Sequence, residues 1–203
     1  FAQYPKGQPH AATGAGGHFP SPGPGSLTVE RGDTGPTVQR LQRILGLTQA
    51  RSVLEVGCNA GWNMRAIREA NPGIAMVGVD VNSAALTEAR NEGLEVVAMT
   101  AGEVGEKFPD TFDLVFTAGV LIHIPPESLT AAMLSIVRAS TKHVLCVEYE
   151  SDAEEEVTYR GHANRLWRRP YGMLYERMGL VLVASGHAGP GFDDCHYTLL
   201  RKK

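Results

Sequence analysis

Residues 52–61 constrain the fold of this chain more than any other segment: an apolar run containing one acid is followed by two glycines four residues apart, and then by a helix-like stretch. A strand that enters a helix through such a turn brings backbone amides up to a ligand at the carboxyl edge of a parallel sheet. A second apolar run ends in Asp80, 19 residues after Gly61. An acid at that position can accept hydrogen bonds from both hydroxyls of a ribose. The two features together predict a nucleoside-containing cofactor.

Strand-like and helix-like patterns alternate over the middle of the chain. We predict strands at 52–56, 75–79, 94–99, 112–116 and 143–148, and helices at 63–70, 83–91 and 125–139. This alternation indicates an α/β fold, with a parallel sheet covered by helices on both faces.

The two ends of this region are predicted to differ from its middle. A helix is expected near residues 37–45, with Gly46 as its stop, and a last helix is expected over 166–178. Two further strands, 180–185 and 195–200, have no helix between them. They should therefore form an antiparallel hairpin at one end of the sheet.

Residues 1–35 are predicted to be an extension of the domain formed by residues 36–203. The stretch 5–25 is rich in Gly and Pro, with Ser, Ala and His between them. Such a composition buries too little apolar area to offset the entropy of ordering it alone. We interpret it as a flexible tail or, alternatively, as a lid that folds over the active site when ligands bind.

The glycine turn does not fit the phosphate-binding patterns of other nucleotide sites. In a G-x-G-x-x-G turn the three positions would be Gly57, Asn59 and Trp62, so two of the three glycines are missing. A Walker loop ends in Gly-Lys-Ser/Thr, and the sequence has none. A nucleoside without phosphates tolerates a looser turn, and S-adenosylmethionine is such a ligand.

Three segments carry a resemblance to a known family: residues 54–61 (Leu-Glu-Val-Gly-Cys-Asn-Ala-Gly), Val79-Asp80, and residues 112–116 (Phe-Asp-Leu-Val-Phe) followed by residues 120–124 (Val-Leu-Ile-His-Ile). In this order and spacing the sequence resembles the class I S-adenosylmethionine-dependent methyltransferases over residues 51–149. The resemblance implies a Rossmann-like fold, doubly wound around a mostly parallel seven-stranded sheet with an antiparallel terminal hairpin. It also implies S-adenosylmethionine as cofactor and S-adenosylhomocysteine as product.

By this resemblance Glu55 and Gly57 would shape the methionine pocket and Asp80 would hold the ribose. Many members carry an acid after the third strand, near the adenine amine, and here Thr100 or Glu103 could serve. The predicted cofactor-binding residues are Glu55, Gly57, Cys58, Asn59, Gly61, Asp80, Val81, Thr100, Ala101, Glu103, Thr117, Ala118 and Val120.

A narrower resemblance rests on downstream segments: Gly119-Val-Leu-Ile-His-Ile-Pro-Pro, Val147-Glu148-Tyr149, Tyr159-Arg160-Gly161-His162 and Trp167-Arg168-Arg169. Over residues 52–172 they resemble the methylases associated with pseudaminic acid and related sugar biosynthesis. That resemblance implies an anionic or sugar-like acceptor.

Two histidines are candidate bases for removing a proton from the acceptor. His123 follows the strand 112–116 and should lie at the carboxyl edge, beside the transferred methyl group. Histidine titrates near neutrality and can take such a proton. His123 could equally pack against the cofactor or cap the next helix. His162 is the second candidate, because it lies in a basic segment that could stand over the sheet edge.

That basic segment is the predicted substrate clamp. Its residues are Tyr159, Arg160, His162, Arg165 and Arg168, with Arg169 beside them. Arginine presents a planar fork that matches a carboxylate or phosphate. The alternative is a helix face whose charges are neutralised by the acidic run at 150–156.

Composition limits the other partners. The net charge is -3 and the isoelectric point about 6.2, so no nucleic-acid partner is expected. No apolar run approaches the length of a membrane span, and no secretory signal is apparent, so no membrane partner is expected. Three unpaired cysteines favour a reduced, cytoplasmic protein without structural zinc. No metal is expected at Asp193-Asp194-Cys195-His196 either, because successive strand residues face opposite ways.

These observations predict an enzyme: an S-adenosylmethionine-dependent methyltransferase that acts on an oxygen, or alternatively a nitrogen, of a small polar metabolite. The acceptor would be anionic or sugar-like and belong to a biosynthetic pathway. A non-catalytic S-adenosylmethionine-binding scaffold or regulator is the alternative from another class. Asn59 and Trp62 argue against a third reading, a nicotinamide oxidoreductase. The oligomeric state stays open.

Overall fold

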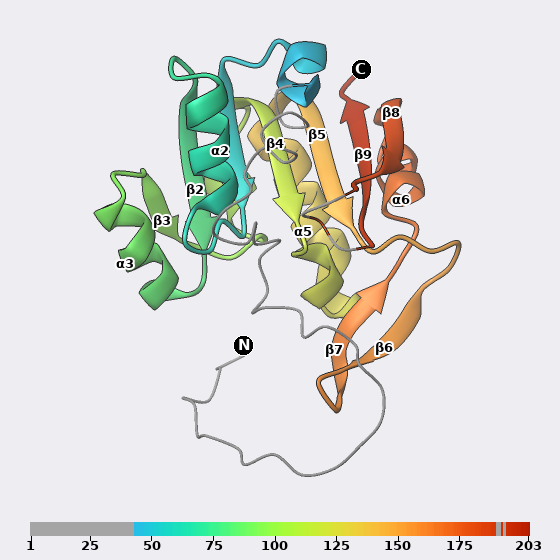
Figure 1. Ribbon diagram of the computed structural model, residues 1–203. Coiled ribbons are helices and arrows are strands. Elements are labelled where there is room, and N and C mark those ends of the chain that lie inside the picture. The colour runs from blue at the N-terminus through green and yellow to red at the C-terminus, as the bar shows by residue number, and fades with distance from the viewer. Residues whose placement is uncertain (1–42, 190–191, 193) are drawn as a thin grey trace, which may run out of the picture.

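A mixed sheet with helices on its two faces forms the centre of the molecule (Figure 1). The computed structural model describes residues 43–189, 192 and 194–203. Within them the seven-stranded sheet has the order β3-β2-β1-β4-β5-β9-β8. Its strands are β1 (Ser52–Val56), β2 (Ala75–Asp80), β3 (Val96–Ala98), β4 (Phe112–Ala118), β5 (Ser140–Glu148), β8 (Val181–His187) and β9 (His196–Arg201). Strands β1 to β5 are parallel, and β9 runs antiparallel to both β5 and β8.

Helices fill most of the connections between the strands. They are α2 (Trp62–Ala70), α3 (Ser83–Asn91), α4 (Val104–Lys107), α5 (Pro126–Ala139) and α6 (Tyr171–Arg177), with a 3-10 turn η1 (Leu121–His123) before α5. A separate two-stranded sheet is formed by β6 (Glu155–Tyr159) and β7 (His162–Arg168), which make an antiparallel hairpin.

The central strands are apolar on both faces because the sheet is covered on both sides. On β1, Leu54 and Val56 belong to the core cluster that includes Ile136 of α5. Val53, which directly precedes Leu54, belongs to the opposite cluster, together with Ile67 of α2. Successive side chains of a strand point to opposite faces, so each neighbour packs under a different helix. Burial on both faces explains why the run 53–56 is apolar apart from Glu55.

The predicted α/β fold class and the antiparallel terminal strands are confirmed. The predicted last helix over 166–178 is wrong in its first part, because Leu166 lies in β7 and the helix begins at Tyr171. The hairpin of β6 and β7 was not predicted as strands. Its turn is made by Arg160 and Gly161, which both have positive φ. Val157 and Tyr159 alternate with polar residues and pack against the core. Because this alternation is short and lies in a segment rich in charged residues, it gave no clear strand pattern in the sequence.

Smaller differences concern element ends. The helix before β1 continues through the expected stop at Gly46 to Thr48, and the left-handed residue is Gln49, with φ of 51°. The third strand is shorter than expected, and α4 was not predicted. The predicted extension over residues 1–35, and most of the predicted helix at 37–45, lie outside the described residues.

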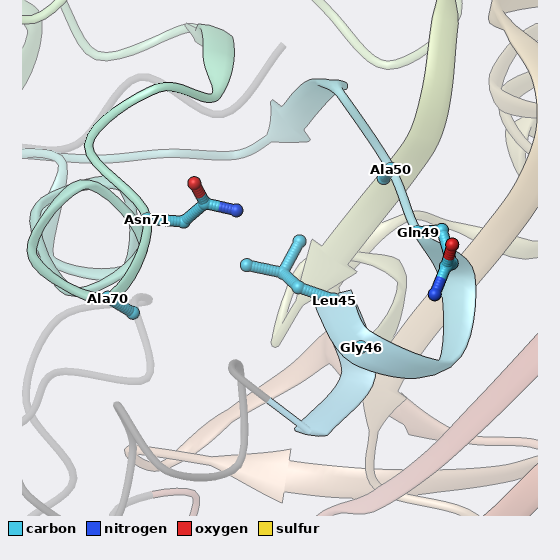
Figure 2. A pocket seen from close by; sticks show the side chains of 6 residues that line it. All are labelled: Leu45, Gly46, Gln49, Ala50, Ala70 and Asn71. Carbon is cyan, nitrogen blue, oxygen red and sulfur yellow. The ribbon is translucent and has the colours of Figure 1, made fainter.

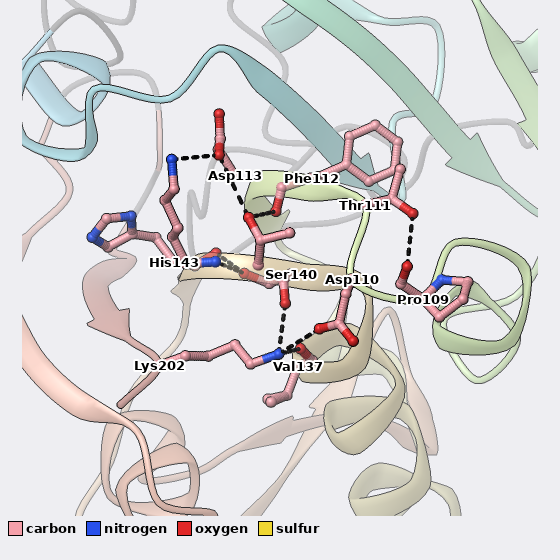
Figure 3. A network of polar contacts seen from close by, with 11 residues as sticks. Pro109, Asp110, Thr111, Phe112, Asp113, Val137, Ser140, His143 and Lys202 are labelled. Atoms are coloured by element: carbon pink, nitrogen blue, oxygen red, sulfur yellow. Dashed lines mark hydrogen bonds and ion pairs between the residues drawn. The ribbon is translucent and has the colours of Figure 1, made fainter.

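Polar contacts join the amino-terminal edge of the parallel strands to the end of the chain (Figure 3). The ammonium group of Lys202 donates to Asp110 Oδ1 at 2.9 Å and to the carbonyl oxygens of Ser140 and Val137. Asp113 and Lys142 form an ion pair of 2.8 Å at the same edge. These contacts hold the strands at the edge opposite the glycine turn.

Candidate functional site

The glycine turn after β1 is a tight backbone loop at the carboxyl edge of the sheet. The amides of Gly57 and Cys58 both donate to the carbonyl oxygen of Val79, at 2.7 and 2.9 Å. Gly57 has φ of 80°, and a Cβ atom added there would lie 2.2 Å from a methyl group of Val120. Gly61, with φ of 79°, precedes α2. Both positions need glycine because the left-handed conformation and the close approach exclude a side chain.

Asp80 lies where the sequence placed it, at the end of β2 beside this turn. Its carboxylate accepts a hydrogen bond from the amide of Asn59 at 2.8 Å and another from the amide of Asn82, also at 2.8 Å. The carboxylate thus connects the glycine turn to the start of α3, which Asn82 caps. A carboxylate can accept about four hydrogen bonds, so capacity for a ligand hydroxyl remains.

Glu55 is buried beneath the turn rather than at its surface. Its Oε1 accepts a hydrogen bond of 2.7 Å from the amide nitrogen of Asn63 on α2. Burial raises the pKa of Glu55 to about 8, and the negative charge of Asp80 adds to this effect. Glu55 Oε2 and Asn63 Oδ1 have no hydrogen-bond partner among the described residues. The carboxyl group is therefore protonated at neutral pH, with polar atoms available beneath the loop.

The side chain of Cys58 does not face the loop surface. It packs with Met64 and Leu86 in a small core cluster, and Gly78 of β2 leaves room for its sulfur. Burial also raises the pKa of the thiol, so it is not a reactive thiolate. Of the predicted cofactor residues, Cys58 thus offers only backbone atoms. Val81, which directly follows β2, is by contrast 67% exposed.

Thr100 and Glu103, which were predicted to lie near the adenine of the cofactor, bond each other in the loop after β3. Glu103 Oε2 accepts hydrogen bonds from the amide and the hydroxyl of Thr100, at 2.8 and 2.6 Å. These bonds lower the pKa of Glu103. The amide of Met99 donates to the carbonyl oxygen of Asp80, so this loop adjoins the end of β2. Thr100, Ala101 and Glu103 therefore lie at the same edge as Asp80.

The turn after β4 rests on a buried acid whose role the sequence analysis missed. Glu148, at the end of β5, accepts hydrogen bonds from the amides of Val120 and Ile122, at 3.2 and 3.4 Å. Burial raises the pKa of Glu148 to about 7. The Thr117 hydroxyl and the backbone amides of the turn limit this rise, because they favour the charged carboxylate. An acid at the end of an apolar strand was the available signal. Thr117 and Ala118, predicted near the sulfonium, are buried in β4 beneath this turn.

His123 ends this turn and faces the hairpin. Its Nδ1 lies 2.7 Å from the carbonyl oxygen of Arg165 on β7, and its ring contacts that of Tyr159 edge to face, with centroids 5.4 Å apart. A carbonyl oxygen only accepts, so Nδ1 carries the proton and Nε2 keeps the lone pair. Burial lowers the pKa of His123, and the positive charge of Arg160 lowers it further. The ring is therefore neutral, with Nε2 as its basic atom.

The predicted clamp residues lie on the hairpin, but not all face solvent. Arg160, His162 and Arg165 are exposed, while Tyr159 and Arg168 are half-buried. Arg168 lies over the ring of Tyr149 and 3.8 Å from Asp194. The interpretation of the cluster as a helix face is wrong, because these residues are on strands and their turn.

Arg169, beside the predicted clamp, is buried and cannot meet a substrate from solvent. Its side chain is 1% exposed, and Nε lies 2.6 Å from Glu154 Oε2. Nη1 donates to the carbonyl oxygen of Leu121 at 3.0 Å. The guanidinium therefore joins the exit of the hairpin to the turn that carries His123.

A pocket elsewhere on the molecule is unrelated to these residues. It is lined by Leu45, Gly46, Gln49, Ala50, Ala70 and Asn71 (Figure 2). These residues lie before β1 and at the end of α2, on the amino-terminal side of the strands. The glycine turn and Asp80 are at the other edge, so this pocket is not the predicted cofactor site.

Two further observations concern the described residues alone. They contain no group of three or more His, Cys, Asp or Glu side chains that could hold a metal ion, and Asp193 lies outside them. None of their helices is both long and apolar enough to cross a membrane.

The sheet order, with the antiparallel strand pair at one end and helices on both faces, is that of the Rossmann-like methyltransferase structures. Residues 54–145 match the family model described as a methyltransferase domain. The N1-methyltransferase of 1,6-didemethyltoxoflavin from Burkholderia thailandensis superposes with a TM-score of 0.67 at 19% identity, over 86% of this chain and 80% of that one. Magnesium protoporphyrin IX methyltransferase from Synechocystis PCC 6803, solved with S-adenosylmethionine bound, has a TM-score of 0.63 at 15% identity, over 82% and 78%.

Curated relatives correct the narrower resemblance. Ubiquinone biosynthesis O-methyltransferase from Aliivibrio fischeri is 34% identical over 100 residues, which cover 46% of this chain and 39% of that protein. Its counterpart from Photobacterium profundum is 35% identical over 95 residues, covering 43% and 40%. The chain thus spans about two fifths of the length of these relatives. These relatives are O-methyltransferases of ubiquinone biosynthesis, not methylases associated with pseudaminic acid.

Proposed function

We propose that this chain binds S-adenosylmethionine over the carboxyl edge of β1 and β2 and transfers its methyl group to a small metabolite. The observation that carries the proposal is the hydrogen bond between Asp80 and the amide of Asn59. It supports the proposal because an acid that adjoins such a turn can accept hydrogen bonds from ribose hydroxyls. Thr100 and Glu103 adjoin the same edge, where an adenine would lie. Solved neighbours of this fold hold S-adenosylmethionine or S-adenosylhomocysteine, which supports this choice of ligand.

The acceptor we propose is an oxygen of a small polar metabolite in a biosynthetic pathway. Curated relatives are O-methyltransferases, which favours oxygen, although one solved neighbour methylates nitrogen. Arg160 and Arg165 are exposed on the hairpin and would recognise an anionic group. A phenol or an acidic sugar would each fit an oxygen acceptor with a nearby negative charge.

His123 is the base we propose, acting through Nε2. The cofactor supplies a methyl group already activated by a positively charged sulfur. Nε2 would take the proton of the acceptor hydroxyl, and the methyl group would pass from the cofactor's sulfur to the acceptor oxygen, which would leave a neutral thioether. Because Nδ1 is held by the Arg165 carbonyl and the ring is neutral, Nε2 is ready to accept this proton. His162, the second predicted base, is exposed beside the turn of the hairpin, and no side chain or backbone group of the described residues fixes its ring as the Arg165 carbonyl fixes that of His123.

The test has two parts. Calorimetry should detect binding of S-adenosylmethionine and S-adenosylhomocysteine, whereas NAD should not bind. Incubation with labelled methyl donor and a panel of catechols, phenolic acids and acidic sugars, followed by mass spectrometry, should then identify a methylated product. Cofactor binding without any transfer, across this panel and a metabolite extract, would favour the scaffold alternative instead.

A further inference from the structure

The turn that carries His123 is held between two buried side chains, an acid and an arginine. On one side, the carboxyl group of Glu148 accepts hydrogen bonds from the amides of Val120 and Ile122. Arg169 donates to the carbonyl oxygen of Leu121 from the other. Both side chains are 1% exposed. Burying a carboxylate and a guanidinium is costly unless each is well bonded, so their presence around one three-residue turn calls for an explanation.

Arg169 also belongs to the hairpin that covers His123. It directly follows β7, and its Nε bonds Glu154, which directly precedes β6. The two ends of the hairpin are thereby joined through one guanidinium, which lies 5.0 Å from the ring of Trp167. The side chain of Arg169 therefore contacts both the base of the hairpin and the η1 turn that ends at His123.

We propose that Arg169 is a positioning residue, which fixes the hairpin against the η1 turn so that the Arg165 carbonyl holds Nδ1 of His123 and Nε2 faces the acceptor. This inference rests on the proposed function for its catalytic meaning. The charged and titratable groups facing the turn are Glu148 from β5, and Tyr159, Arg160 and Arg169 from the hairpin and its exit. Arg169 acts through His123 and does not touch the substrate.

The test compares Arg169→Met and Arg169→Lys with the control Arg177→Met. Arg177 is an exposed arginine of α6, and within the described part of the chain its side chain bonds Met173 of the same helix alone. Nitrogen-15 NMR of the histidine rings reports the tautomer and titration of His123 without any substrate. We expect the wild type and Arg177→Met to show one tautomer, protonated at Nδ1. Arg169→Met should show a mixture of tautomers and a higher His123 pKa, because the ring becomes less buried. Arg169→Lys should restore the wild-type pattern in part.

Activity supplies a second readout once an acceptor is known. We expect Arg169→Met to lower kcat by about 10- to 100-fold, as misplaced catalytic groups do, with the affinity for S-adenosylmethionine unchanged. Failure of the proposed function would appear as no methyl transfer by the wild type, whereas the NMR result would still decide the positioning role. An unchanged His123 tautomer and pKa in folded Arg169→Met would overturn the proposal.

A milder variant covers the case in which Arg169→Met does not fold. Glu154→Ala removes the half-exposed partner of the guanidinium and leaves Arg169 in place. We expect the same changes at His123 in smaller measure, while Glu154→Gln, which keeps an acceptor oxygen, should resemble the wild type. Identical His123 spectra in Glu154→Ala and the wild type would count against the proposal.

Discussion

Nδ1 of His123 lies 2.7 Å from the carbonyl oxygen of Arg165, a residue 42 positions later in the chain. This contact joins the turn after β4 to a hairpin that belongs to a different sheet. It assigns the ring proton to Nδ1 and the lone pair to Nε2. A histidine of the parallel-sheet edge and a backbone oxygen of the hairpin thus form one unit.

Replacing His123 by Gln should lower kcat by about 10²- to 10⁴-fold, the usual contribution of a positioned base. Binding of S-adenosylmethionine, measured by calorimetry, should not change. His143→Gln is a matched control, because His143 lies at the other edge of the sheet (Figure 3). Equal activity of His123→Gln and the wild type would exclude His123 as the base.

The pH dependence of kcat/KM should report the titration of His123. Burial lowers the pKa of His123 below its ordinary value of 6.5, and the base works only when neutral. The rate should therefore rise with pH through a value below 6.5 and be level at neutrality. His123→Gln should lose this rising limb. A limb centred above pH 7 in the wild type would contradict the assignment.

Asp80→Asn should weaken the binding of S-adenosylmethionine by about 10- to 100-fold, since hydrogen bonds to a charged group contribute about 1.5–3 kcal/mol. The substitution keeps one oxygen that can accept from the turn, so the fold should survive. Asp113→Asn serves as control, because Asp113 pairs with Lys142 at the far edge of the sheet. Calorimetry should show a loss for the first variant and none for the second.

Gly57→Ala should destabilise the protein by about 1–3 kcal/mol, because a new Cβ in the left-handed conformation overlaps a methyl group of Val120. Gly46→Ala is the matched control: it lies in a helix, and among the described residues no atom outside the adjoining helix backbone lies within 4 Å of the new Cβ. There we expect a gain of about 0.5–1 kcal/mol. Urea unfolding measures both, and changes of the same sign would refute the steric argument.

Glu55 should make the folded state less stable as the pH rises. Its pKa is about 8 in the folded protein against 4.5 when exposed, so between these values the unfolded chain releases the proton first. The free energy of unfolding should fall by at most about 1.4 kcal/mol for each pH unit of this window. Glu55→Gln should lose this contribution, so it should depend on pH less than the wild type in urea unfolding between pH 5 and 8.5.

Much of this site is local in sequence and was predictable. The glycine turn, Asp80 and the approximate ends of the parallel strands follow from residue type and spacing, because each depends on neighbours within one strand–turn–helix unit. The tertiary structure added the directions of the side chains. The side chain of Cys58, a predicted cofactor-binding residue of the turn, packs in the core, so only its backbone atoms are left for that role.

The sequence by itself determined the α/β class, the terminal antiparallel pair and the edge of the sheet that carries the candidate site, because hydrophobic periodicity and glycine positions record local backbone choices. Only the tertiary structure decided that residues 155–168 form a hairpin, that Arg169 is buried, and that Glu148 and Arg165 meet the turn of His123. Those contacts join residues 26 to 48 positions apart. Charged residues that are usually exposed become buried when the folded chain supplies a partner, and no local pattern identifies that partner.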